Sequence, residues 1–302
     1  MRLHGVFPIL PTPFHEDERL DLESLTRIVG FMRRAQVDGV TVLGVLGEAN
    51  RLSDVEREQV IRTAVAAAQG LPVIVGASAS GTHAARELAQ GAQSLGAAAV
   101  MVTPHPEPVP SDERVFDYYR AIADGLGIPI VLQDHPASTQ VHMAPALIAR
   151  IANELPAIAA IKQEALPTAP KIRQLRALLR RPISILTGLG ALYALFDLEA
   201  HADGFNTGFA FPEVLMALLV SAKAGDWARA RSIYQRFLPL IVFEQQPGVA
   251  IRKEIFRLRG LMRSSRVRHP GGGIMPETAA QLRTLLDWLL PGADLEQPLA
   301  LA

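Results

Sequence analysis

The sequence contains no cysteine among its 302 residues. Disulfide bonds, cysteine-bound zinc and a thiol nucleophile are therefore excluded, although the absence of cysteine fits any compartment. The chain also has no excess of one charge, because thirty Lys and Arg residues balance thirty Asp and Glu residues. No overall field then favours nucleic acid or an anionic membrane. Small metabolites are the partners that this composition leaves open.

Long apolar runs are absent as well. No stretch reaches the roughly eighteen consecutive apolar residues of a membrane-spanning helix, and the N-terminal segment soon meets proline, unlike a signal peptide. We therefore expect a soluble, cytoplasmic protein. Hydrophobic residues make up 49% of the chain, which is enough for one large core.

Short β-rich runs alternate along the chain with segments of helical apolar spacing. The runs cover residues 6–10, 39–43, 72–75, 98–102, 128–132, 157–161, 183–186 and 202–206. Eight strand–helix units of about 25–30 residues favour a closed barrel of parallel strands. An open doubly wound sheet is the alternative, but no Gly-x-Gly-x-x-Gly motif follows the first run. The predicted fold is thus α/β, a (β/α)₈ TIM barrel.

The strands end before the chain does. Three further segments, 226–243, 248–260 and 276–289, are predicted to be helices, and no long polar linker precedes them. We expect residues 1–225 to form the barrel. Residues 226–302 should form a helical extension that packs on the barrel within one structural domain.

Lys162 is the most informative residue for chemistry. Active residues of such barrels come from the C-terminal ends of the strands, and Lys162 follows the apolar residues 159–161. An amine that has lost part of its solvent is a nucleophile for a carbonyl carbon. Glu164 points the same way if the extended backbone continues, and it could exchange protons there. Spacing alone equally allows a lysine that reaches solvent, with Glu164 as its ion-pair partner.

Four segments in order carry a resemblance to a known family. They are Pro11-Thr12-Pro13, Gly44-x-x-Gly47-Glu48, Ile161-Lys162-x-Glu164 and Thr187-Gly188. Over about residues 4–290 the chain resembles the dihydrodipicolinate synthase/N-acetylneuraminate lyase family. The resemblance implies that Lys162 forms a Schiff base with pyruvate or another 2-oxo acid, without cofactor or metal. It also implies that the turn at 44–48 binds the substrate carboxylate, partly through backbone N–H groups.

Departures from the family pattern limit which of the family's activities this chain could have. Val45 and Leu46 replace two threonines, and Gln133 stands where the family has a proton-relaying tyrosine. Glutamine cannot act as an acid or base. Ser138 replaces the arginine with which dihydrodipicolinate synthases bind a second carboxylate, so that activity is disfavoured.

The chain resembles more closely the branch of 2-keto-3-deoxy sugar-acid dehydratases, including those that act on L-2-keto-3-deoxyarabonate. This branch lacks the tyrosine and uses a glutamate two residues after the lysine, which Glu164 matches. Segments 207–212, 238–241 and 267–270 support the same branch. The aromatic residue that the branch carries in the turn is absent, because Leu46 stands there.

The expected site therefore has Lys162, Glu164 and Gln133 as catalytic residues. The expected substrate-binding residues are Thr12, Val45, Leu46, Gly47, Glu48, His135, Thr187, Gly188 and Asn206. The chemistry is either aldol cleavage of a pyruvate-type substrate or dehydration of a 2-keto-3-deoxy sugar acid. A phosphate site on the glycines after the last two strands and a non-catalytic barrel that binds 2-oxo acids are the alternatives. The resemblance further implies a homotetramer or homodimer.

Overall fold

A computed structural model describes residues 3–108, 111–246 and 248–301 of the chain. In these residues eight parallel strands form one sheet in the order β1-β8-β7-β6-β5-β4-β3-β2. The strands are β1 Gly5–Val6, β2 Val40–Val42, β3 Val73–Gly76, β4 Ala99–Val102, β5 Ile130–Asp134, β6 Ile158–Gln163, β7 Ser184–Thr187 and β8 Gly204–Phe205. A parallel bridge between Ile9 and Thr41 joins the first strand segment to β2 and brings the two edges together. The predicted TIM barrel is confirmed.

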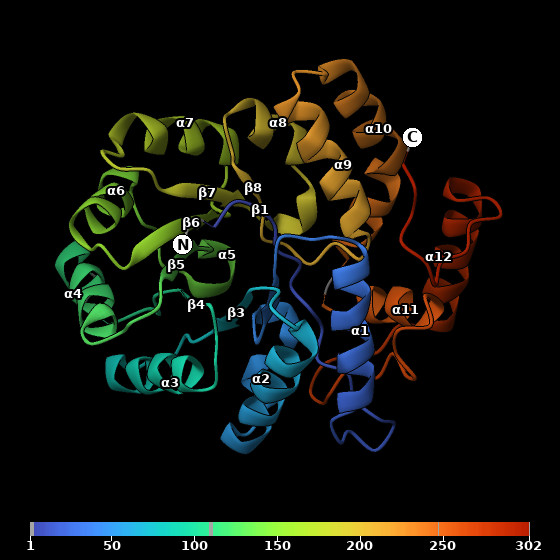
Figure 1. The fold of residues 1–302 in the computed structure, drawn as a ribbon, viewed down its shortest axis with the longest axis horizontal. Helices are drawn as coiled ribbons and strands as arrows, with labels where there is room; N and C mark the ends of the chain where they lie inside the picture. The colour runs from blue at the N-terminus through green and yellow to red at the C-terminus, as the bar shows by residue number, and fades with distance from the viewer. Residues whose placement is uncertain (1–2, 109–110, 247, 302) are drawn as a thin grey trace.

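Helices alternate with the strands and surround them (Figure 1). Those that follow β1 to β8 are α1 Leu22–Arg34, α2 Asp54–Ala68, α3 Thr82–Ser94, α4 Asp112–Ala123, α5 Pro136–Thr139, α6 Pro145–Glu154, α7 Thr168–Leu178, α8 Ala194–Glu199 and α9 Pro212–Lys223. Local signals set several of their ends. Ser53 and Glu56 form a capping box that begins α2, since each side chain binds the backbone N–H of the other residue.

The C-terminal helices are α10 Trp227–Phe243, α11 Ala250–Leu258 and α12 Pro276–Leu289, close to the predicted ranges. They gather on one side of the barrel, where α10 packs along α9 (Figure 1). Buried side chains of the main hydrophobic cluster come from both sides of residue 225, among them Leu218 and Phe237. The division of the chain at that residue stays a prediction. No helix in the described ranges is long and apolar enough to cross a membrane.

Inward-facing side chains fill the barrel. A separate buried cluster inside it consists of Leu3, Phe7, Ile74, Ala99, Met101, Val131, Ala160 and Leu186. Because side chains alternate along a strand, the next inward positions on β5 and β6 belong to Gln133 and Lys162. The apolar layer thus ends where a polar layer begins, at the C-terminal mouth of the barrel.

Two strands extend further than the sequence indicated. The predicted runs 128–132 and 157–161 stop at the last apolar residue, whereas β5 continues to Asp134 and β6 to Gln163. The parallel ladder includes these polar residues and pairs Gln133 with Lys162. Conversely, the predicted first strand, 6–10, is shortened, because Pro8 has no N–H group for the ladder.

Candidate active site

Lys162, Glu164 and Gln133 form a buried polar centre at the end of β5 and β6. Lys162 Nζ lies 3.0 Å from Glu164 Oε2, and these side chains are only 3% and 6% exposed. The Gln133 amide donates to the same oxygen at 2.7 Å. The backbone N–H of Leu189 donates to Glu164 Oε1 at 3.1 Å. The structure therefore brings all three predicted catalytic residues together, with Glu164 at the centre.

The surroundings of Glu164 stabilise its carboxylate form. Burial raises the pKa of Glu164, but the Lys162 ammonium, the nearby His135 and the bonds from Gln133 and Leu189 outweigh burial. The pKa of Glu164 thus lies below its usual value. A carboxylate held in this way is a base that can accept a proton from the amine or from a substrate carbon.

Gly188, which follows β7, packs directly against this carboxylate. A Cβ atom on Gly188 would lie 2.1 Å from Glu164 Oε1, so a larger residue would displace the glutamate. The neighbouring Thr187 faces the other way. Its hydroxyl donates to Asp197 of α8, which also accepts from Thr168 at 2.6 Å. The Thr187 hydroxyl is therefore not directed at Lys162.

The turn at 44–48 is a short 3₁₀ turn after β2, Val45–Gly47. Thr12 Oγ1 donates to the Gly47 carbonyl at 2.6 Å and fixes the turn against the first strand segment. Within the described residues, the backbone N–H groups of Val45 and Leu46 donate to no other protein group. The Val45 side chain is 58% exposed, whereas Leu46 reaches over Gly208. Free N–H groups at such a turn suit a carboxylate oxygen.

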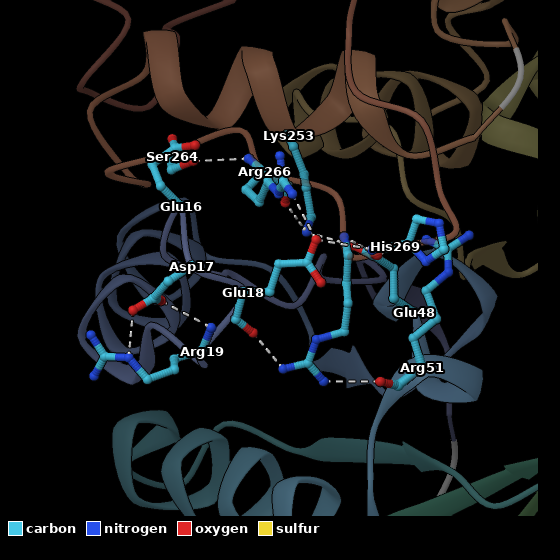
Figure 2. Close-up of polar contacts among 11 residues, drawn as sticks. Glu16, Asp17, Glu18, Arg19, Glu48, Arg51, Lys253, Ser264, Arg266 and His269 are labelled. Carbon is cyan, nitrogen blue, oxygen red and sulfur yellow. Dashed lines mark hydrogen bonds and ion pairs between the residues drawn. The ribbon is translucent and has the colours of Figure 1, made fainter.

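Glu48, the last residue of this turn, forms ion pairs with neighbouring cations. Its carboxylate lies 2.5 Å from Lys253 Nζ and 2.7 Å from Arg51 Nη1 (Figure 2). It also accepts from the Arg268 backbone N–H at 3.0 Å. These contacts tie the turn to α11 and to the segment that follows it. Glu48 thus positions the turn, and its own charge would repel a substrate carboxylate.

Lys253 is a residue that sequence reasoning missed. It is fully buried, and its ammonium lies 4.3 Å from the centre of the Phe14 ring. Burial lowers the pKa of Lys253 to about 8, although the Glu48 carboxylate opposes that shift. One signal was available, because Lys253 stands in a helical segment among the apolar residues Ile251, Ile255 and Phe256.

Asn206 and His135 complete the predicted set. The Asn206 amide donates to Thr41 Oγ1 at 2.8 Å, and its buried Oδ1 has no partner in the described ranges. His135 shares a 2.6 Å hydrogen bond between Nδ1 and Ser138 Oγ. Burial lowers the pKa of His135, while Glu164 acts in the opposite direction. His135 therefore lies within electrostatic reach of the centre.

Possible metal ligands do not cluster in the part of the chain that the structure describes. No group of three or more His, Asp or Glu side chains there could hold a metal ion. The groups that the site itself presents are an amine, a carboxylate and hydrogen-bond donors.

Comparisons with known proteins show which family the chain belongs to. A sequence model described as the Dihydrodipicolinate synthetase family matches residues 2–288. The chain belongs to this family. The predicted resemblance is therefore confirmed, and the protein is an enzyme of the lyase type.

Relatives within the dihydrodipicolinate synthetase family carry two kinds of name. The chain is 36% identical over 296 residues to L-2-keto-3-deoxyarabonate dehydratase of Azospirillum brasilense, covering 96% of each protein. It is 33% identical over 245 residues to 4-hydroxy-tetrahydrodipicolinate synthase of Chlorobium chlorochromatii, covering 79% of this chain and 81% of that relative. A solved structure, dihydrodipicolinate synthase from Rhodopseudomonas palustris, matches with a TM-score of 0.90 at 38% identity, covering 94% of this chain and 97% of that one.

Proposed function

We propose that the protein dehydrates a 2-keto-3-deoxy sugar acid through a Schiff base on Lys162, without an external cofactor. The observation that carries this proposal is the buried Lys162–Glu164 pair at 3.0 Å, with Gln133 as a donor to Glu164. Gln133 occupies the position of the family's relay tyrosine and cannot relay protons, so Glu164 is the base nearest the amine. The similarity to a sugar-acid dehydratase supports the same activity.

Formation of the imine uses Lys162 and Glu164 together. Glu164 accepts a proton from the Lys162 ammonium, and the neutral amine attacks the C2 carbonyl carbon of the substrate. Two protons pass in turn from the nitrogen to the former carbonyl oxygen, carried by Glu164, and this oxygen leaves as water. A protonated imine remains on Lys162. The free N–H groups of Val45 and Leu46 hold the substrate carboxylate during these steps.

Elimination then uses the same glutamate. Glu164, again a carboxylate, removes a proton from C3, and the electron pair moves toward the positive imine nitrogen to form an enamine. Glu164 delivers this proton to the C4 hydroxyl, which leaves as water while the C3–C4 double bond forms. Addition of water at C2 releases the product and restores the Lys162 amine. Asn206 and Thr12 act as positioning residues in this scheme.

Aldol cleavage is the second candidate, because breaking the C3–C4 bond leads to the same enamine. The synthase activity named among the relatives is disfavoured, since Ser138 is bonded to His135 and supplies no cation for a second carboxylate. A barrel that only binds 2-oxo acids would need neither a buried amine nor an adjacent base.

We further propose that the protein is cytoplasmic and forms a homodimer or a homotetramer. Size-exclusion chromatography with light scattering would measure the number of subunits.

The deciding experiment is borohydride reduction in the presence of pyruvate, followed by intact and peptide mass spectrometry. The expected result is a stable adduct on Lys162 that is absent from Lys162→Arg. Turnover is then measured with a panel of 2-keto-3-deoxy acids, with loss of one water as the readout for dehydration. An adduct without turnover would favour the binding protein. No adduct with any 2-oxo acid would overturn the imine chemistry.

A further inference from the structure

Arg252 in α11 is a buried cation that the proposed mechanism does not use. Its side chain is only 7% exposed, and its Nε lies 3.0 Å from Glu244 Oε2. Glu244 is itself fully buried and accepts from the Ala210 backbone N–H at 3.2 Å. The two terminal nitrogens of Arg252 make no hydrogen bond to any described residue. Nε and Glu244 Oε2 are fully buried without a hydrogen-bond partner among the described residues, whereas the terminal nitrogens are not fully buried and can therefore donate to a bound ligand.

The free end lies at the rim of the mouth that contains the lysine. A Cβ atom on Gly190 would lie 2.9 Å from Arg252 Nη2, and one on Gly208 would lie 3.6 Å from Arg252 Cδ. These glycines belong to the loops after β7 and β8. Gly190 is two residues beyond Gly188, which touches Glu164. The loop after β7 therefore contacts both the guanidinium, through Gly190, and the Glu164 carboxylate, through Gly188.

The turn that is assigned to the substrate carboxylate meets the same place. A Cβ atom on Gly208 would lie 2.1 Å from Leu46 Cδ1, and Arg252 contacts this same glycine. When the turn holds the carboxylate of a 2-oxo acid and C2 is bonded to Lys162, the carbons from C3 onward can extend toward this rim. Arg252 lies against the loops after β7 and β8, and glycines of the same two loops contact Glu164 and the Leu46 side chain.

The charge of the site indicates what Arg252 binds. Glu244 lies against the guanidinium, and burial raises the pKa of Glu244 to about 7 although Arg252 opposes that shift. The substrate class proposed above has one carboxylate, which the turn at 44–48 holds, so its distal oxygen atoms are those of hydroxyl groups. The Nη groups still require oxygen acceptors, which hydroxyl groups provide. We infer that Arg252 binds the hydroxyl groups at the far end of the sugar-acid substrate and selects such acids over pyruvate. This inference rests on the proposed function.

The test compares substrates with and without a hydroxylated tail in Arg252→Gln. Loss of a hydrogen bond to a charged group corresponds to about 10- to 100-fold in affinity. We expect KM for a five-carbon 2-keto-3-deoxy acid to rise by that factor. Borohydride trapping with pyruvate should stay within about twofold of the wild type. Arg257→Gln is the matched control, because Arg257 lies in the same helix, is partly exposed and, among the described residues, pairs only with Glu254.

Two further variants keep the inference falsifiable. Arg252→Lys retains the charge but loses the planar fork, and an intermediate KM is expected. In a Lys162→Ala background, Arg252→Gln should weaken calorimetric binding of the five-carbon acid, which reports on contact without turnover. An unchanged KM, or an equal loss of pyruvate trapping, would overturn the role of Arg252. Failure of the wild type to trap any 2-oxo acid would instead overturn the proposed function.

Discussion

The contact between Gly188 and Glu164 makes a sharp prediction for Gly188→Ala. The new Cβ atom would lie 2.1 Å from Glu164 Oε1 and 2.4 Å from its Cδ, whereas ordinary contacts begin near 3.4 Å. The carboxylate must therefore move by about 1.3 Å. That movement breaks its bond from Leu189 and takes it away from Lys162 and Gln133. A displacement of about 1 Å in a catalytic group can cost about 100-fold in rate.

We expect kcat of Gly188→Ala to fall by about 100-fold, because proton transfer at C3 depends on the position of Glu164. The new methyl group does not touch Lys162, so borohydride should still trap the imine after long incubation at saturating pyruvate, although imine formation is slower because it also uses Glu164. The assay measures both quantities on the same preparation. Gly91→Ala is the control, since a Cβ atom on Gly91 in α3 meets nothing within 4 Å. A kcat for Gly188→Ala within twofold of the wild type would refute the assignment of Glu164.

Three other predictions follow from the ion pairs. Glu164→Gln should lower kcat by about 10²- to 10⁴-fold, the usual contribution of a general base, while mass spectrometry still detects the adduct after long incubation. Lys253→Met removes one of the two cations that pair with the buried Glu48 carboxylate and leaves Arg51, so urea unfolding should show a loss of about 1–3 kcal/mol, and KM should rise more than kcat falls. Hydrogen bonding from Arg268 lowers the pKa of Glu56 to about 2, below its usual value near 4.5. A carboxyl group whose pKa is lowered by folding stabilises the fold above about pH 4.5, and this contribution is lost as the pH falls toward 2. Lowering the pH from 5 to 3 should therefore decrease the Tm of the wild type more than the Tm of Glu56→Gln, as measured by thermal unfolding at each pH.

Local patterns were enough to predict most of the fold. The β-rich runs alternate with helical segments because every strand of a parallel barrel is buried on both faces, and this burial is visible in composition. The position of Lys162 directly after an apolar run placed it at the barrel mouth for the same reason. Glu164 followed from the alternation of side chains along a strand, and it lies beside Lys162 as that alternation predicts.

The register between strands and the approach of distant helices were decided only by the tertiary structure. Gln133 meets Glu164 because β5 and β6 pair in one particular register, and apolar periodicity does not specify the register of polar residues at strand ends. Glu48 faces Lys253, and Arg252 reaches the loops after β7 and β8, because α11 packs against the turn after β2 and against these loops. The sequence by itself determined the order of strands and helices and the position of Lys162 and Glu164 at the end of a buried strand. Barrel closure decided which of them meet, since contacts between residues far apart in the chain depend on the packing of whole elements.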